Sequence, residues 1–155
     1  HNFYHGAGRA LWILKGDDVK AFSAVVNSIP KKYQDDAYSG YGMGVAFTKL
    51  DDPRLVFSFL ERDKLDASVR APFVTGVTMG LVIRSLSDPD YWRETLGKFS
   101  PQDRCRVERL VTFGKESLAL AERGGGDLHS NWRGLIAKRV SDTRHTADNM
   151  QAACG

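Results

Sequence analysis

The sequence is poor in the residues that build small metal or disulfide frameworks. Cysteine occurs only at Cys105 and Cys154 in 155 residues, which is too few for a zinc framework or a dense disulfide scaffold. Among the four histidines, only His1 and His5 are spaced as in a helical metal site, and His1 starts the chain. We therefore expect no metal and no cofactor, and we take the cytoplasm as the default location.

The chain also lacks a strong charge and a long apolar run. Its net charge of +3 comes from 22 basic and 19 acidic residues, and the charge is spread along the chain, so nucleic acid is not an expected partner. The longest apolar run, residues 71–83, is too short to span a bilayer. The chain starts at His1 without an initiator methionine or a signal peptide, and we expect it to be part of a longer protein.

Signals for β-strands are missing too. No segment alternates with period two for long, and Asn-Gly or Asp-Gly hairpin turns are absent. Apolar residues instead recur at helical spacing, and Asp, Ser, Pro and Gly stand where helices would start or end. This pattern predicts an all-α protein of about seven helices. We expect helices over about 3–14, 19–29, 31–49, from Asp52-Pro53, 66–84, from Asp88-Pro89, 102–123 and 128–140. Residues 1–140 would form the domain, and residues 141–155 a frayed C-terminal tail.

Three of these helices share a pattern. The block from Gly40 matches the block from Gly76 with a shift of 36, and an earlier copy from Gly6 matches it with a shift of 34. Repetition at this period indicates stacked antiparallel helix pairs, as in a short α-solenoid-like repeat domain.

Glycine inside a helix is costly, by roughly 1 kcal/mol relative to alanine, and so demands a reason. Gly40 and Gly44 share one helix face, as do Gly76 and Gly80. The favoured interpretation is close helix-on-helix contact. The alternative is that a flat ligand lies on the bare face beside Tyr38 and Tyr41.

No residue set supports a catalytic centre. The acidic residues fit helix starts, where carboxylates cap backbone N–H groups, and the basic residues near the C-terminus, Arg133 among them, fit a solvated face. Arg9 follows a glycine pair, and we expect it to be buried against an acid or helix carbonyls, with an anion grip as the alternative. We therefore favour a protein that is not an enzyme.

Three blocks resemble an uncharacterised bacterial family labelled enediyne biosynthesis protein, a domain of unknown function. They are Gly-x-Gly-Arg followed by an aromatic residue, aromatic-Ser-Gly-x-Gly, and Trp-Arg near the end. The matching positions are Gly6, Gly8, Arg9, Trp12, Tyr38, Ser39, Gly40, Gly42, Trp132 and Arg133. Tyr38 stands where the family pattern has Trp. The resemblance covers residues 3 to about 140 and implies an association with polyketide gene clusters, without catalytic residues to transfer.

Two functions remain open. The first is a non-catalytic helical-repeat binding module for another protein, accessory to bacterial secondary metabolism. The second is an accessory protein that binds or converts a hydrophobic polyketide-type small molecule. For either, the expected binding residues are the polar and aromatic ones near the glycine face: His5, Arg9, Trp12, Tyr38, Tyr41 and Arg70.

Overall fold

The computed structural model describes residues 1–49, 56–59 and 65–142, and these residues contain helices and turns but no strand. The predicted all-α class is therefore confirmed, whereas the α-solenoid-like arrangement stays a prediction. The elements are α1 (Asn2–Lys15), α2 (Val19–Val26), the 3-10 helix η1 (Lys31–Tyr33), α3 (Gln34–Thr48), α5 (Ala67–Ser87), α6 (Pro89–Leu96), α7 (Pro101–Gly124) and α8 (Leu128–Asp142).

The helix starts predicted from capping residues are confirmed where the structure describes them. Each capping side chain accepts a hydrogen bond from a backbone N–H of its first turn, as expected for Asp and Ser at this position. The caps are Asp18, Asp66, Asp88 and Ser100. The predicted start at Asp52-Pro53 lies outside the described residues, as does most of the predicted tail, although α8 continues two residues past the predicted domain boundary.

Two predicted helix bounds differ from the structure. The helix predicted over 19–29 ends at Val26, where the Ser28 hydroxyl bonds the Val25 carbonyl and competes with helical pairing. The helix predicted over 31–49 begins with the 3-10 turn η1 before α3 starts. Both changes fall at helix ends, where neighbouring contacts decide the last turn.

The glycine faces are contacts between helices, as the favoured interpretation holds. A Cβ atom placed on Gly40 would lie 1.8 Å from the His5 carbonyl oxygen, and one on Gly76 would lie 1.7 Å from the Ser39 carbonyl oxygen. A Cβ atom on Gly44 would lie 2.9 Å from Cδ1 of the Trp12 side chain, whereas the first two contacts are with backbone oxygens. No side chain fits at these distances, so glycine allows α1, α3 and α5 to approach one another at the backbone.

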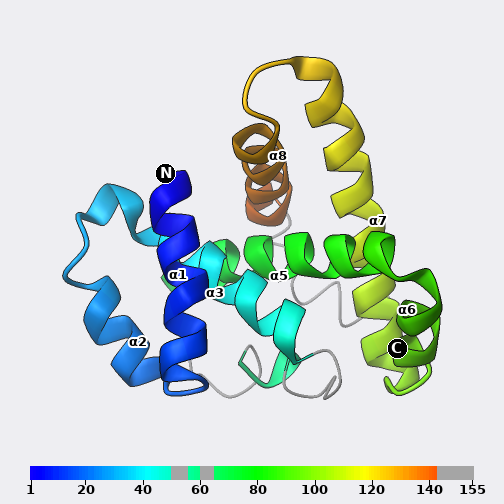
Figure 1. Cartoon of the computed structure of the whole chain (residues 1–155), viewed down its shortest axis with the longest axis horizontal. Coiled ribbons are helices and arrows are strands. Elements are labelled where there is room, and N and C mark those ends of the chain that lie inside the picture. Colours follow the sequence, from blue (N-terminus) through cyan, green and yellow to red (C-terminus); the bar gives the residue numbers. More distant parts are fainter. Residues whose placement is uncertain (50–55, 60–64, 143–155) are drawn as a thin grey trace.

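The three glycine-bearing helices run in the same direction. His1 contacts Asp36 and Trp12 contacts Thr48, so α1 and α3 meet start to start and end to end. Ser39 faces Gly76, and Met43 faces Gly80, which sets α3 and α5 in the same relation. These contacts join residues 35 to 37 positions apart, close to the spacing of the sequence copies. Figure 1 shows α5 across the centre of the molecule, with α1 and α3 toward its left.

An aromatic cluster fills the space beside these helices. Tyr41 is fully buried and stacks on Phe22 with ring centroids 3.9 Å apart. Trp12, Phe59 and Phe73 contact the same tyrosine ring. Burying such rings supplies much of the hydrophobic stabilisation of a small domain.

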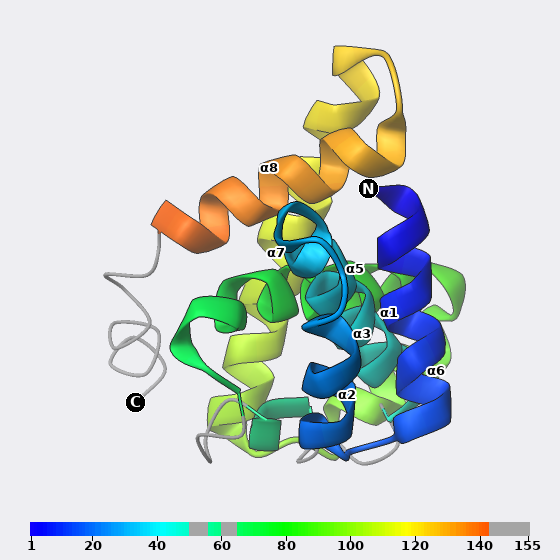
Figure 2. The ribbon, with the colours of Figure 1, turned by 90° about the vertical axis from the view of Figure 1, so that its left-hand side faces the viewer.

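The last two helices pack on the other part of α5. Gly114 of α7 lies against Thr78 and Val82 of α5, and Trp132 of α8 donates a hydrogen bond to the Gly114 carbonyl. In Figure 2, α8 runs across the upper part of the view, below the end of α7 and above α3 and α5, and it packs on α5 and α7. This placement brings the start of α8 to the starts of α1 and α3.

One helix, α5, is long and apolar enough to cross a membrane by length and composition alone. Of its apolar window, 61% is buried inside the molecule. Core helices of globular proteins meet the same criterion, and the glycine contacts described above place α5 in such a core.

Candidate functional site

The aromatic residues predicted to bind a partner lie in the core. Trp12, Tyr38 and Tyr41 are each at most 5% exposed. Their polar atoms bond within the protein, to Thr48, Ser23 and the Gly16 carbonyl respectively. Burial raises the pKa of Tyr41, and the nearby Asp17 and Asp18 raise it further. The structure therefore brings these three together as packing residues, and their binding role stays a prediction.

The three basic residues of the predicted set have different surroundings. Arg9 is exposed, so the expectation that it is buried is wrong: its backbone N lies against Gly40 of α3, while its side chain reaches solvent. Arg70 is partly buried and donates to the Leu65 carbonyl. The backbone carbonyl of His5 packs against Gly40 of α3, and its buried side chain lies edge-on to the ring of His129.

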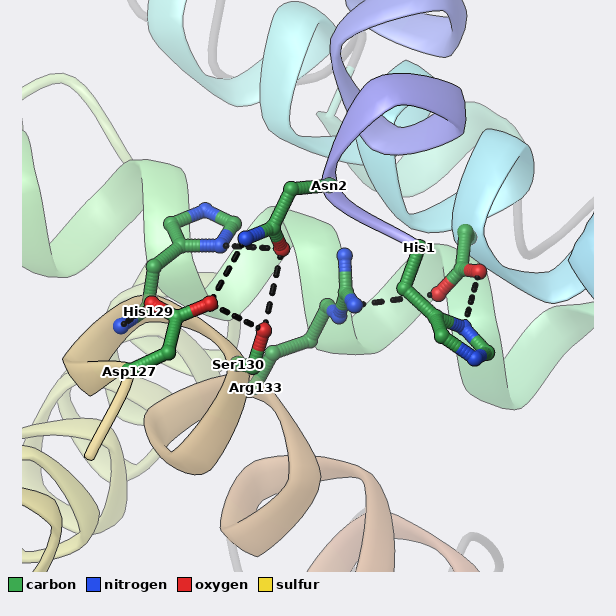
Figure 3. A network of polar contacts seen from close by, with 7 residues as sticks. His1, Asn2, Asp127, His129, Ser130 and Arg133 are labelled. Carbon is green, nitrogen blue, oxygen red and sulfur yellow. Dashed lines mark hydrogen bonds and ion pairs between the residues drawn. The ribbon is translucent and has the colours of Figure 1, made fainter.

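A buried ion pair joins α8 to α3. Arg133 Nη2 lies 3.1 Å from Asp36 Oδ1, and His1 Nδ1 lies 2.6 Å from Asp36 Oδ2. The His1 imidazole and the Arg133 guanidinium thus both reach the same carboxylate, and Figure 3 shows these two labelled side chains pointing toward the same place. The Asp36 and Arg133 side chains are only 11% and 10% exposed, so each compensates a charge that would be costly to bury alone.

A second polar cluster closes the adjoining corner. Asn2 donates to Asp127, Ser130 donates to both Asn2 and Asp127, and His129 Nδ1 lies 3.3 Å from the Asn2 oxygen (Figure 3). The hydroxyl of Ser130 and then the amide of Asn2 lower the pKa of Asp127 to about 2. The two clusters together tie the start of α1 to the start of α8.

The two neighbouring histidines are held neutral. Burial, then the positive charge of Arg133, lower the pKa of His5 to about 3. The same two causes lower the pKa of His129, against the opposing effect of Asp127. The lowered pKa values favour the neutral form of both imidazoles, which suits a structural junction.

A pocket of about 290 Å³ opens beside the ion pair, between α3, α5 and α8. Arg133 and Ser39 both line it, and each keeps one buried polar atom, Nη1 and Oγ, without a hydrogen-bond partner among the described residues. Such atoms are uncommon in folded proteins because leaving them unbonded is costly. Sequence reasoning missed this pocket. It assigned Arg133 to a solvated face, which is wrong, and it explained the acidic residues by their places at helix starts alone.

The outer surface of α1 carries the second feature, an apolar stripe. Phe3 and Leu14 are 77% and 75% exposed. Between them, Ala10 is exposed and Gly6 and Ala7 are partly exposed. These five residues, at helical spacing on one side of α1, are called the outer face of α1 below.

The chemistry available for metals and nucleophiles is limited in the described part of the chain. There, no three His, Cys, Asp or Glu side chains are grouped so that they could hold a metal ion. Cys105 on α7 is not a free thiol, so it offers no nucleophile. The polar pocket and the outer face of α1 are therefore the features that a function can be built on.

Comparisons with known proteins place the chain in a family. No curated protein matches the sequence, and no solved structure matches the fold. The sequence model of a family described as protein of unknown function (DUF1702) matches residues 1–85, which include α1, α3 and nearly all of α5. More than half of the chain follows this family pattern, so the chain belongs to the family of proteins of unknown function DUF1702.

Proposed function

We propose that this chain is a non-catalytic helical binding module that accepts a helix of a partner protein on the outer face of α1. One observation carries the proposal: the residues of this face are equivalent, at the shifts of the sequence repeat, to residues that another helix covers in α3 and α5. The next paragraphs develop that equivalence and its test.

The repeat shift of 34 pairs the outer face of α1 with the face of α3 that α1 covers. Phe3, Gly6, Ala7 and Ala10 correspond to Ala37, Gly40, Tyr41 and Gly44, all of which are buried. A further shift of 36 leads to Phe73, Gly76, Val77 and Gly80 of α5, which are buried beneath α3 or in the core beside it. On α1 alone the equivalent positions stay open.

The composition of the outer face suits a helix as the occupant. Gly6 and Ala10, four residues apart, let another backbone approach closely, and a Cβ atom on Gly6 would meet no described atom within 4 Å. Phe3 and Leu14 stand at the two ends and supply apolar area. Exposed apolar surface of this kind usually marks a contact with another macromolecule, and a helix laid in such a face is a common recognition mode.

The proposal also includes the cellular role of the protein and the kind of partner it has. The resemblance to enediyne biosynthesis proteins supports a role accessory to bacterial secondary metabolism, and we keep the cytoplasm as the default location. The partner would then be another protein of that system, and nucleic acid and membrane spans have no part in it.

The alternative function has narrower support. A protein that binds or converts a hydrophobic polyketide-type molecule would present its aromatic residues to a cavity. The pocket described above is lined by neither Trp12, Tyr38 nor Tyr41. The resemblance alone favours this alternative, and the experiment below separates it from the first.

A photo-crosslinking amino acid at Ala10 tests the proposal in cells of the source organism. The matched control carries the same amino acid at Ala119, an exposed alanine on α7. We expect a defined protein species to crosslink from position 10 and not from position 119, with the attachment mapped by mass spectrometry to a helical segment of the partner. The additional change Gly6→Glu should abolish the crosslink and leave the helix content unchanged.

Identical crosslinked species from both positions would contradict the proposal. A small hydrophobic molecule attached at position 10, in place of a protein, would support the alternative. A crosslink that survives Gly6→Glu would mean that the partner does not lie on the outer face of α1.

A further inference from the structure

The pocket between α3, α5 and α8 lies away from the outer face of α1 and differs from it in chemistry. Ala71 and Pro72 of α5 and Gly134 and Ala137 of α8 form its apolar walls. At about 290 Å³ it is at the small end of the range for ligand sites, which begins at roughly 300 Å³. The pocket suits a small molecule or the terminal group of a larger one.

Two unused hydrogen-bond donors belong to residues of this lining. Arg133 is 8% exposed and uses Nη2 for the ion pair with Asp36, which leaves Nη1 without a described partner. Ser39 is 2% exposed, and its Oγ also has none. Leaving a buried donor unbonded is costly, so an acceptor that satisfied both groups would bind favourably.

The charges of the lining select against an anion. Arg133 is balanced by Asp36, and Asp35 adds a second carboxylate to the same pocket. Because the charge of Arg133 is already balanced by Asp36, a ligand carboxylate would find no uncompensated positive charge on this guanidinium. An uncharged carbonyl oxygen can accept from N–H and O–H donors without needing such a charge.

Thr75 adds a third polar group of defined orientation. Its hydroxyl donates to the Ala71 carbonyl inside α5, so its oxygen is left to accept. A ligand amide offers both a carbonyl oxygen, for Arg133 and Ser39, and an N–H, for Thr75. This donor and acceptor set distinguishes an amide from a ketone.

We propose that the pocket lined by Ser39, Thr75 and Arg133 is a binding site for an uncharged carbonyl compound of the amide class, separate from the partner surface on α1. The ion pair with Asp36 holds Arg133 in place, and Ser39 supplies the second donor. The site binds and positions the amide; no bond is made or broken there.

An NMR titration of the full chain tests the site with two probes of nearly equal size. N-methylacetamide represents the amide, and acetate represents the anion. We expect saturable amide shifts at Ser39, Thr75 and the Arg133 side chain with N-methylacetamide, and binding of acetate weaker by about tenfold or more, since the two probes differ mainly in charge.

Three variants locate the binding. Gly134 lines the pocket, and a Cβ atom there would meet no described atom within 4 Å, so Gly134→Leu should fill the pocket without disturbing the fold. Gly124→Leu, also at a helical glycine with open surroundings, is the matched control. We expect Gly134→Leu to abolish the shifts, Gly124→Leu to keep them, and Ser39→Ala to weaken N-methylacetamide by about tenfold.

Each contrary result is informative. Absence of saturable shifts would mean that only water satisfies Arg133 and Ser39, and the proposal would fall. Acetate binding as tightly as the amide would overturn the assignment to uncharged ligands. Shifts that persist in Gly134→Leu would place the binding elsewhere on the molecule.

Discussion

At the scale of single residues, burial decides what each polar group of the junction can do. Arg133 and Asp36 keep their charges inside the protein because they face each other at 3.1 Å. Within the described part of the chain, the charged neighbours of the buried His5 imidazole are Arg133, His129 and Arg9, and none of them is an acid. The same junction thus stabilises a charged pair and a neutral histidine.

His5 should make the protein less stable in acid. Its folded-state pKa of about 3 lies below the ordinary value of about 6.5, so between these values the unfolded chain binds the extra proton. The free energy of unfolding should therefore rise with pH across this interval, by up to about 1.4 kcal/mol per pH unit. The contribution is fully present above about pH 6.5 and is lost as the pH falls.

Urea unfolding of the parent and of His5→Met at several pH values measures this effect. We expect the free energy of unfolding of the variant to depend less steeply on pH, by the equivalent of about one bound proton. A smaller slope of the same sign should remain from His129. Equal slopes for the two proteins would show that His5 is not held neutral in the folded state.

At the scale of elements, glycine has two opposite effects in helices with similar sequence blocks. On α3 and α5 it removes a side chain where another backbone passes, and the contact repays the cost of a flexible residue. On α1, Gly6 occupies the equivalent position without a covering helix. The difference lies in the neighbour and not in the local sequence.

Alanine at Gly40 and at Gly6 should therefore change stability in opposite directions. Gly40→Ala places a methyl group 1.8 Å from the His5 carbonyl oxygen and should destabilise by about 1–3 kcal/mol through overpacking. Gly6→Ala meets open space and should stabilise by about 0.5–1 kcal/mol through helix propensity. Thermal melts followed by circular dichroism compare the two, and equal effects would contradict the close contact of α1 with α3.

At the scale of the whole molecule, long-range polar contacts join the last helix to the first ones. Residues 127–133 meet residues 1–36 across almost the full length of the chain, while α5 contacts both α3 and α7. The family match covers residues 1–85, and α8 completes the pocket that the matched segment leaves open. Both parts of the chain are therefore needed for the proposed amide site.

Replacing one partner of the ion pair should lower the free energy of unfolding more than replacing both partners. Arg133→Met leaves Asp36 buried with His1 as its remaining described partner, and we expect a loss of about 3 kcal/mol in the free energy of unfolding. The double variant Asp36→Asn, Arg133→Met should recover part of that loss, because no uncompensated charge remains. Urea unfolding in a double-mutant cycle gives the coupling, and strictly additive losses would rule out a functioning ion pair.

The sequence by itself determined the helices, their capped starts and the close glycine contacts. Asp18, Asp66, Asp88 and Ser100 act on N–H groups two or three residues away, and such local effects can be read from spacing alone. Gly40 and Gly76 indicated a close contact because glycine destabilises the interior of a helix unless a contact requires it.

Only the tertiary structure decided which side chains are covered. Arg133 is of a residue type that usually lies in solvent, yet α8 places it in a buried position against Asp36. Arg9 lies in a glycine motif where we expected burial, yet it is exposed. Burial depends on partners far away in the sequence, and the helical period carries no information about which neighbour arrives on which face.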